Sequence, residues 1–182
     1  MQYEIDNTAW QRVGLLLFLT FFLTSKGYAV DNLKFKGNLV EGACSIRPGD
    51  EDISLEFRQI TSKYLYLNTR TLGERFELHL EGCDTAIADS VTIMFDGTPN
   101  MQLPGLLALG AGSVASGVGI GIETLQGKPL PLGEVSDEQS ISDGANVIEL
   151  QAYVQGEPQA IADHTIGAGV FNATSTFTLD YP

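Results

Sequence analysis

The chain has few of the residues on which most catalytic and metal sites depend. Among its 182 residues are two cysteines and two histidines. It has no Cys-x-x-Cys pair for zinc and no Gly-x-Ser-x-Gly turn for a serine nucleophile. The glycine-rich residues 110–121 do not complete a phosphate-binding motif that opens a helix. We therefore expect no enzymatic activity, no metal site and no cofactor.

The remaining polar candidates are predicted to be surface residues. His79 has the polar parity of a predicted strand, and His164 follows Asp163 in a predicted loop. The loop carboxylates are interpreted as solvated, with a weak calcium site as the less favoured alternative. These carboxylates are Asp84, Asp89, Asp96, Asp137 and Glu138.

Basic residues are scarce. The chain has 10 lysines and arginines against 23 aspartates and glutamates, a net charge of −13 at pH 7. Such a balance argues against nucleic acid and against anionic membrane surfaces as partners.

No apolar run is long enough to span a bilayer. The longest, residues 13–24, has the length of a secretory signal core, and small residues at Gly27 and Ala29 follow it. We interpret residues 1–29 as a signal peptide, although Glu4 and Asp6 stand where basic residues are usual; a buried helix is the alternative. Cleavage leaves 182 − 29 = 153 residues, enough for one domain without direct membrane insertion.

The clearest pattern that is present is a strand at the carboxyl end. Residues 171–181 alternate between an apolar-facing set and a polar set. The first set is Phe171, Ala173, Ser175, Phe177, Leu179 and Tyr181. No hairpin partner follows, so either an earlier strand lies beside this one or its edge is open to another chain.

Further alternating stretches predict an all-β domain over residues 40–182. They cover residues 30–46 with a new strand from about Val40, and residues 53–57, 75–81, 90–96, 117–124 and 145–155. Val118, Ile120 and Ile122 are expected on one face of their strand, with glycines on the other. Residues 61–71 are less regular and are expected to form a loop with at most a short strand. No helical period is evident, which favours a two-sheet immunoglobulin-like sandwich.

Cys44 and Cys83 both lie in the exported part of the chain. An even pair of cysteines in an oxidising compartment indicates one disulfide, and a metal pair is the weaker interpretation.

Three stretches resemble the pilin subunits of chaperone–usher fimbriae. They are Phe35-Lys-Gly-Asn-Leu-Val-Glu-Gly-Ala-Cys44, Leu80-Glu-Gly-Cys83 and residues 171–181. The short lead into residues 30–37, with Phe95-Asp-Gly-Thr98 and Leu103-Pro-Gly-Leu106, is most similar to the minor adaptor-type subunits of P-type pilus tips.

The resemblance implies an immunoglobulin-like sandwich that lacks its seventh strand. A periplasmic chaperone lends this strand, and the amino-terminal extension of a neighbouring subunit later replaces it, a standard example of strand addition. Residues 30–39 are then the donor extension, and Cys44–Cys83 matches the family disulfide. The predicted donor residues are Leu33, Phe35, Gly37 and Leu39. Residues 171–181 are expected to border the groove and pair with the chaperone, while the carboxylate of Pro182 meets basic chaperone residues. The alternative is that residues 33–39 form an ordinary first strand of a complete sandwich.

The resemblance also implies the function. We expect a structural subunit that is exported to the periplasm and assembled by the chaperone and an outer-membrane usher into a cell-surface fimbria with neighbouring subunits. The alternatives are a receptor-binding tip adhesin, although family adhesins carry an additional lectin domain, and a secreted enzyme on a β-sandwich.

Overall fold

The computed structural model describes residues 42–182. The predicted signal peptide and the donor residues Leu33, Phe35, Gly37 and Leu39 lie outside the described residues. Within residues 42–182, no helix has the length and apolar character needed to cross a membrane.

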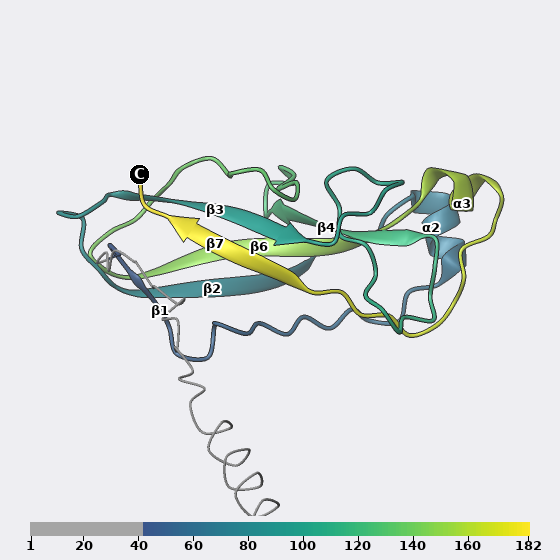
Figure 1. Cartoon of the computed structure of the whole chain (residues 1–182), viewed down its shortest axis with the longest axis horizontal. Helices are drawn as coiled ribbons and strands as arrows, with labels where there is room; N and C mark the ends of the chain where they lie inside the picture. The colour runs from purple at the N-terminus through teal and green to yellow at the C-terminus, as the bar shows by residue number, and fades with distance from the viewer. Residues whose placement is uncertain (1–41) are drawn as a thin grey trace, which may run out of the picture. The chain divides into compact units, whose positions relative to one another are not determined.

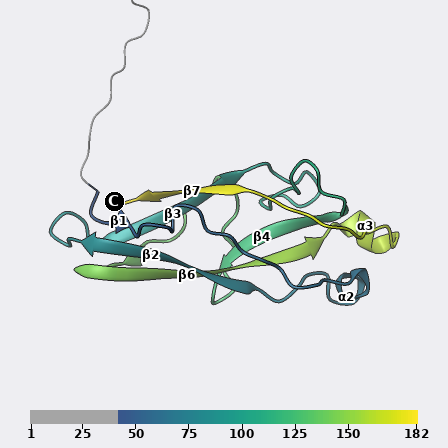
Figure 2. The same cartoon turned by 90° about the horizontal axis from the view of Figure 1, so that it is seen from below.

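The described chain forms two antiparallel sheets that face each other. The four-stranded sheet has the order β1 (Ser45–Ile46), β2 (Glu74–Cys83), β6 (Gly144–Gly156) and β4 (Val118–Thr124). The three-stranded sheet has the order β5 (Gln139–Ser140), β3 (Ser90–Gly97) and β7 (Ser175–Asp180). Figures 1 and 2 show the β3–β7 pair lying over the sheet of β2, β6 and β4. The predicted all-β sandwich is therefore confirmed.

The core lies between the sheets and follows the alternation of each strand. Leu80 of β2 and Leu150 of β6 are fully buried, and Ile93 of β3 is 2% exposed. Successive residues of a strand point to opposite faces, so every second side chain enters this layer. The residue pattern was thus sufficient to place β2, β3, β4 and β6.

Both faces of β4 are buried, whereas the sequence pattern placed only its apolar face in the core. Gly119 and Gly121 are buried as well as the apolar face of the strand. The ring of Tyr153 on β6 lies against Gly121, and a Cβ at that position would overlap it. These glycines therefore permit a close approach on the outer side of the sheet.

The structure differs from the sequence expectations at four places. Residues 61–71 contain the helix α2 (Ser62–Asn68), whose N-cap Thr61 accepts a hydrogen bond from the Tyr64 N–H at 3.3 Å. A second short helix, α3 (Pro158–Ala162), follows β6. The strand expected from about Val40 is limited, within the described residues, to β1. The carboxyl-terminal strand is also shorter than expected, because β7 begins at Ser175.

The predicted disulfide is present. Cys44 precedes β1 and is bonded to Cys83, the last residue of β2. Beside it, the Asp84 N–H donates to the Ala43 carbonyl at 2.9 Å. Of the described residues, only two pairs join β1 to β2, so the disulfide supplies much of the attachment of this part of the chain.

Replacing both cysteines, in Cys44→Ala with Cys83→Ala, is expected to lower the free energy of unfolding by about 3–4 kcal/mol, because the open chain gains conformational freedom when unfolded. Urea unfolding of the mature chain measures the change. Reductant should destabilise the wild type and leave the double variant unaffected. Equal urea midpoints for the oxidised wild type and the variant would contradict this assignment.

Candidate functional site

Within residues 42–182, the β7 strand has a ladder partner on one side only. It pairs with β3 and is the last strand of its sheet. Facing its other edge is an extended segment, residues 51–60, which forms no backbone-to-backbone hydrogen bond with any described residue. Two stretches of backbone thus border a space without pairing across it. Such edges are templates for an additional strand.

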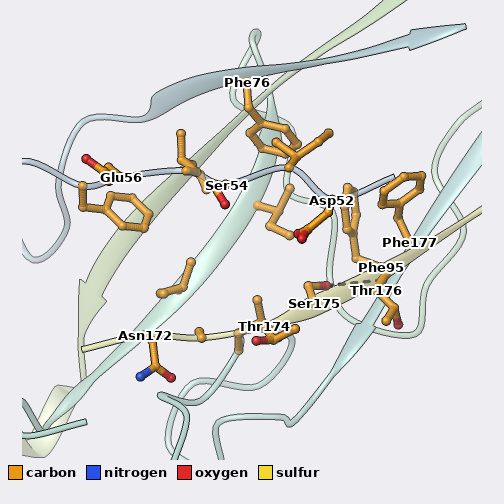
Figure 3. Close-up of a pocket in the computed structure, with 18 of the residues that line it drawn as sticks. Asp52, Ser54, Glu56, Phe76, Phe95, Asn172, Thr174, Ser175, Thr176 and Phe177 are labelled. Atoms are coloured by element: carbon orange, nitrogen blue, oxygen red, sulfur yellow. Dashed lines mark hydrogen bonds between the residues drawn. The ribbon is translucent and has the colours of Figure 1, made fainter. Parts of the chain in front are cut away.

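The space between them is a groove of about 720 Å³. We call residues 51–57 the first wall and residues 171–177 the second wall. Figure 3 shows Asp52 near Thr176 and Glu56 near the end that carries Asn172, so the walls run in opposite directions. The floor is apolar and is supplied by both sheets and the loop before β4. Its residues are Phe76, Phe95, Leu107, Ile120, Ile122 and Ala152.

The inward side chains of both walls are only half-buried. On the first wall these are Ile53, Leu55 and Phe57, and on the second wall and its continuation they are Phe171, Ala173, Ser175, Phe177, Leu179 and Tyr181. The residues between them are exposed. The alternation predicted for the terminal strand is therefore present, but its apolar face lacks full cover. Partial burial raises the pKa of the Tyr181 phenol.

Aromatic contacts define the two ends of the groove. The rings of Phe57 and Phe171, one from each wall, have centroids 6.0 Å apart. Nearer the other end, Phe95 of the floor and Phe177 of the second wall lie 6.4 Å apart. The two walls are therefore in direct side-chain contact through Phe57 and Phe171.

A buried carboxylate anchors the start of the first wall to β2. Asp50, 9% exposed, accepts hydrogen bonds at 2.8 Å from the backbone N–H of His79 and at 3.0 Å from Arg47. The Nδ1 atom of His79 lies 2.8 Å from the same carboxylate, and its Nε2 lies 3.2 Å from Glu77. The His79 contacts, with the backbone bond first and Arg47 adding to them, lower the pKa of Asp50 to about 2.

The two histidines differ from each other in their surroundings. His79 was expected on the surface, but its side chain is 23% exposed and bonded between two carboxylates. His164 is exposed, as expected, and its ring contacts that of Tyr66 at 4.5 Å. Within residues 42–182, no group of three or more potential ligands is placed to hold a metal ion.

Behind the groove floor, a buried carboxylate paired with a partly exposed arginine supports β4. Ile122 faces the groove, while its neighbour Glu123, 1% exposed, lies on the opposite side of the sheet. Glu123 accepts hydrogen bonds from Arg70 at 2.8 Å and from Gln151 at 2.8 Å. Arg70 also lies 4.2 Å above the Tyr153 ring. These contacts satisfy a carboxylate that would otherwise be costly to bury.

Sequence reasoning missed Asp50 and the charged residues of the first wall. The signal for the latter was available, because Asp52, Ser54 and Glu56 alternate with the three inward apolar residues. Nothing in the pattern identified Asp50, because its partner His79 is 29 residues away.

Replacing the anchor, in Asp50→Asn, is expected to destabilise the domain at neutral pH. The pKa of Asp50 is about 2 in the folded chain, below the ordinary value of 3.8. Its stabilisation is therefore fully present above about pH 5 and is lost as pH falls toward 2. The gap between wild-type and variant urea midpoints should narrow over that window.

The matched control is Asp89→Asn, an exposed loop carboxylate. Its urea midpoint should follow that of the wild type at every pH. A gap for Asp50→Asn that stays constant from pH 5 to pH 2 would contradict the anchoring role.

Comparisons with known proteins agree on one family. The fimbrial protein family model matches residues 33–182. The chain is 32% identical to the fimbria A protein of Serratia marcescens, covering 93% of this chain and 97% of that one. It is 33% identical to the putative minor fimbrial subunit PmfF of Proteus mirabilis, covering 82% and 83%. It is 31% identical to the fimbrial adapter PapK of Escherichia coli, covering 90% and 95%.

Solved structures show the same fold. The P pilus rod subunit PapA matches with a TM-score of 0.67 at 22% identity, over 78% of this chain and 100% of that one. A subunit in the structure of a chaperone–usher pilus matches with a TM-score of 0.67 at 24% identity, over 82% and 94%.

Proposed function

Since the chain belongs to the fimbrial protein family, we propose that it is a structural minor subunit whose sandwich is completed by a β-strand from another protein. The chain is a chaperone–usher pilin and not an enzyme. Its similarity to a minor subunit and to a fimbrial adapter supports a minor or adaptor position rather than that of a receptor-binding tip adhesin.

The groove is the observation that carries the proposal. A strand inserted between the walls would pair with the free edge of β7 on one side and with residues 51–57 on the other. It would also cover the half-buried apolar residues of both walls. Strand addition supplies both kinds of contact at once, because main-chain hydrogen bonds provide affinity and alternate side chains enter the floor.

The predicted donor has the dimensions and the pattern that this groove requires. Residues 33–39 are as long as the first wall, seven residues in each case. Leu33, Phe35 and Leu39 place large apolar side chains on one face, and Gly37 provides the small position between them. Full burial of each large side chain contributes about 1.5–3 kcal/mol, so exchange into a well-fitting groove is difficult to reverse.

The same surfaces account for the partners. Before assembly, a periplasmic chaperone occupies the groove and pairs with the terminal strand, and Pro182, which is exposed, presents its carboxylate to basic chaperone residues. An outer-membrane usher then exchanges the chaperone strand for the extension of the next subunit. In this proposal residues 1–29 direct export to the periplasm, and the fibre displays the subunit at the cell surface.

Deletion of residues 30–39 tests the donor assignment. The shortened subunit should still co-purify with its chaperone, because its own groove is intact. It should fail to insert into the preceding subunit, because it has no strand to donate. Chaperone co-purification and incorporation into surface fibres measure the two steps separately, and incorporation at wild-type levels would refute the assignment.

A further inference from the structure

The rim of the groove carries negative charge on one side only. Along the first wall the outward side chains are Asp52, Ser54 and Glu56, and along the second wall they are Asn172, Thr174 and Thr176 (Figure 3). All six are exposed. Among the described residues, neither Asp52 nor Glu56 forms an ion pair. The described residues that line the groove include no lysine, arginine or histidine.

The predicted donor segment of this same chain has the opposite charge on its outward face. When Leu33, Phe35 and Leu39 point into a groove, the alternation turns Lys34 and Lys36 outward. Residues 30–39 contain two lysines and one aspartate, a net charge of +1. Residues 40–182 contain 20 acidic and 6 basic residues, a net charge of −14. The arm is therefore positive and the body that would receive it is negative.

The spacing of these charges fits a strand lying beside the first wall. Asp52 and Glu56 flank Ser54, so a lysine opposite Ser54 has both acids as diagonal neighbours, about 7–8 Å away and within reach of a long side chain. The other lysine, two residues along, then lies directly opposite one of the acids. This arrangement holds whichever direction the strand runs.

We propose that the groove selects residues 30–39 of a second copy of this chain, through Asp52 and Glu56 on one copy and Lys34 and Lys36 on the other. The inference rests on the strand exchange of the proposed function and adds the identity of the donor. A minor subunit that accepts its own extension occurs as a short run of copies. Subunits whose donors carry acidic outward residues are disfavoured by the same wall.

A competition experiment tests this selection. The mature chain is purified as its complex with the periplasmic chaperone and challenged with a peptide of residues 30–39, or with the same peptide carrying Lys34→Glu and Lys36→Glu. At low ionic strength the wild-type peptide should displace the chaperone faster, by a factor on the order of ten, because two attractive cross-strand pairs become repulsive. The difference should shrink in high salt.

A charge swap provides the matched control. In a subunit with Asp52→Lys and Glu56→Lys, the order of the two peptides should reverse. For each subunit, wild-type or swapped, the rate with the wild-type peptide is divided by the rate with the charge-reversed peptide. This ratio does not depend on how tightly that subunit binds the chaperone. A third peptide with Leu33→Ser, Phe35→Ser and Leu39→Ser keeps the lysines and should not displace the chaperone.

The outcomes separate this inference from the proposed function. Equal rates for the wild-type and charge-reversed peptides, with the serine peptide inactive, would overturn the charge selection and leave the groove as the acceptor of donor strands. Failure of every peptide to displace the chaperone would overturn both. Reversal of the order in the swapped subunit would establish that the first wall chooses the donor.

Discussion

The constraint on which this structure depends is the missing ladder between β7 and the first wall. Both segments are extended, and half-buried and exposed side chains alternate along each of them. On the side of the groove, however, neither segment has a hydrogen-bonded backbone neighbour among the described residues. A sheet edge in this condition keeps its shape only if other contacts hold it. The Cys44–Cys83 disulfide and the Asp50–His79 bonds hold the first wall at one end, and the Phe57–Phe171 contact holds it at the other.

The floor of the groove is held by contacts on the outer side of β4 and by the pairing of β4 with β6. Ile122 points into the groove, and the next residue, Glu123, points away to Arg70 and Gln151. Because β4 and β6 are also joined over seven residue pairs, the floor is held by contacts within residues 42–182, with no added strand present. The groove is thus an open but preorganised surface, which lowers the ordering cost that a donor must overcome.

Much of the fold could be predicted from the residues, and the exceptions have physical causes. The period of two identified β2, β3, β4 and β6 because each places one apolar face in the core. The helix α2 was missed because it has seven residues and buries only Leu65, which leaves no amphipathic pattern to detect. The groove could not be seen in the terminal strand itself, because Phe177 and Leu179 alternate in the same way whether their face is covered or waiting for a partner. Recognition of the open edge came from the family resemblance, and its geometry came from the structure.

Charge explains how such an edge is compatible with an isolated subunit before assembly. An exposed apolar edge invites pairing with any other exposed strand, and charged side chains along the edge reduce that risk. Asp52 and Glu56 give two such edges the same sign, so the first walls of two subunits repel each other. The net charge of −14 on residues 40–182 extends this repulsion to the whole body. In the proposed exchange, residues 30–39 would escape this repulsion because Lys34 and Lys36 alternate with Leu33, Phe35 and Leu39. The apolar residues would fill the groove, and the lysines would distinguish a donor strand from an unrelated exposed strand.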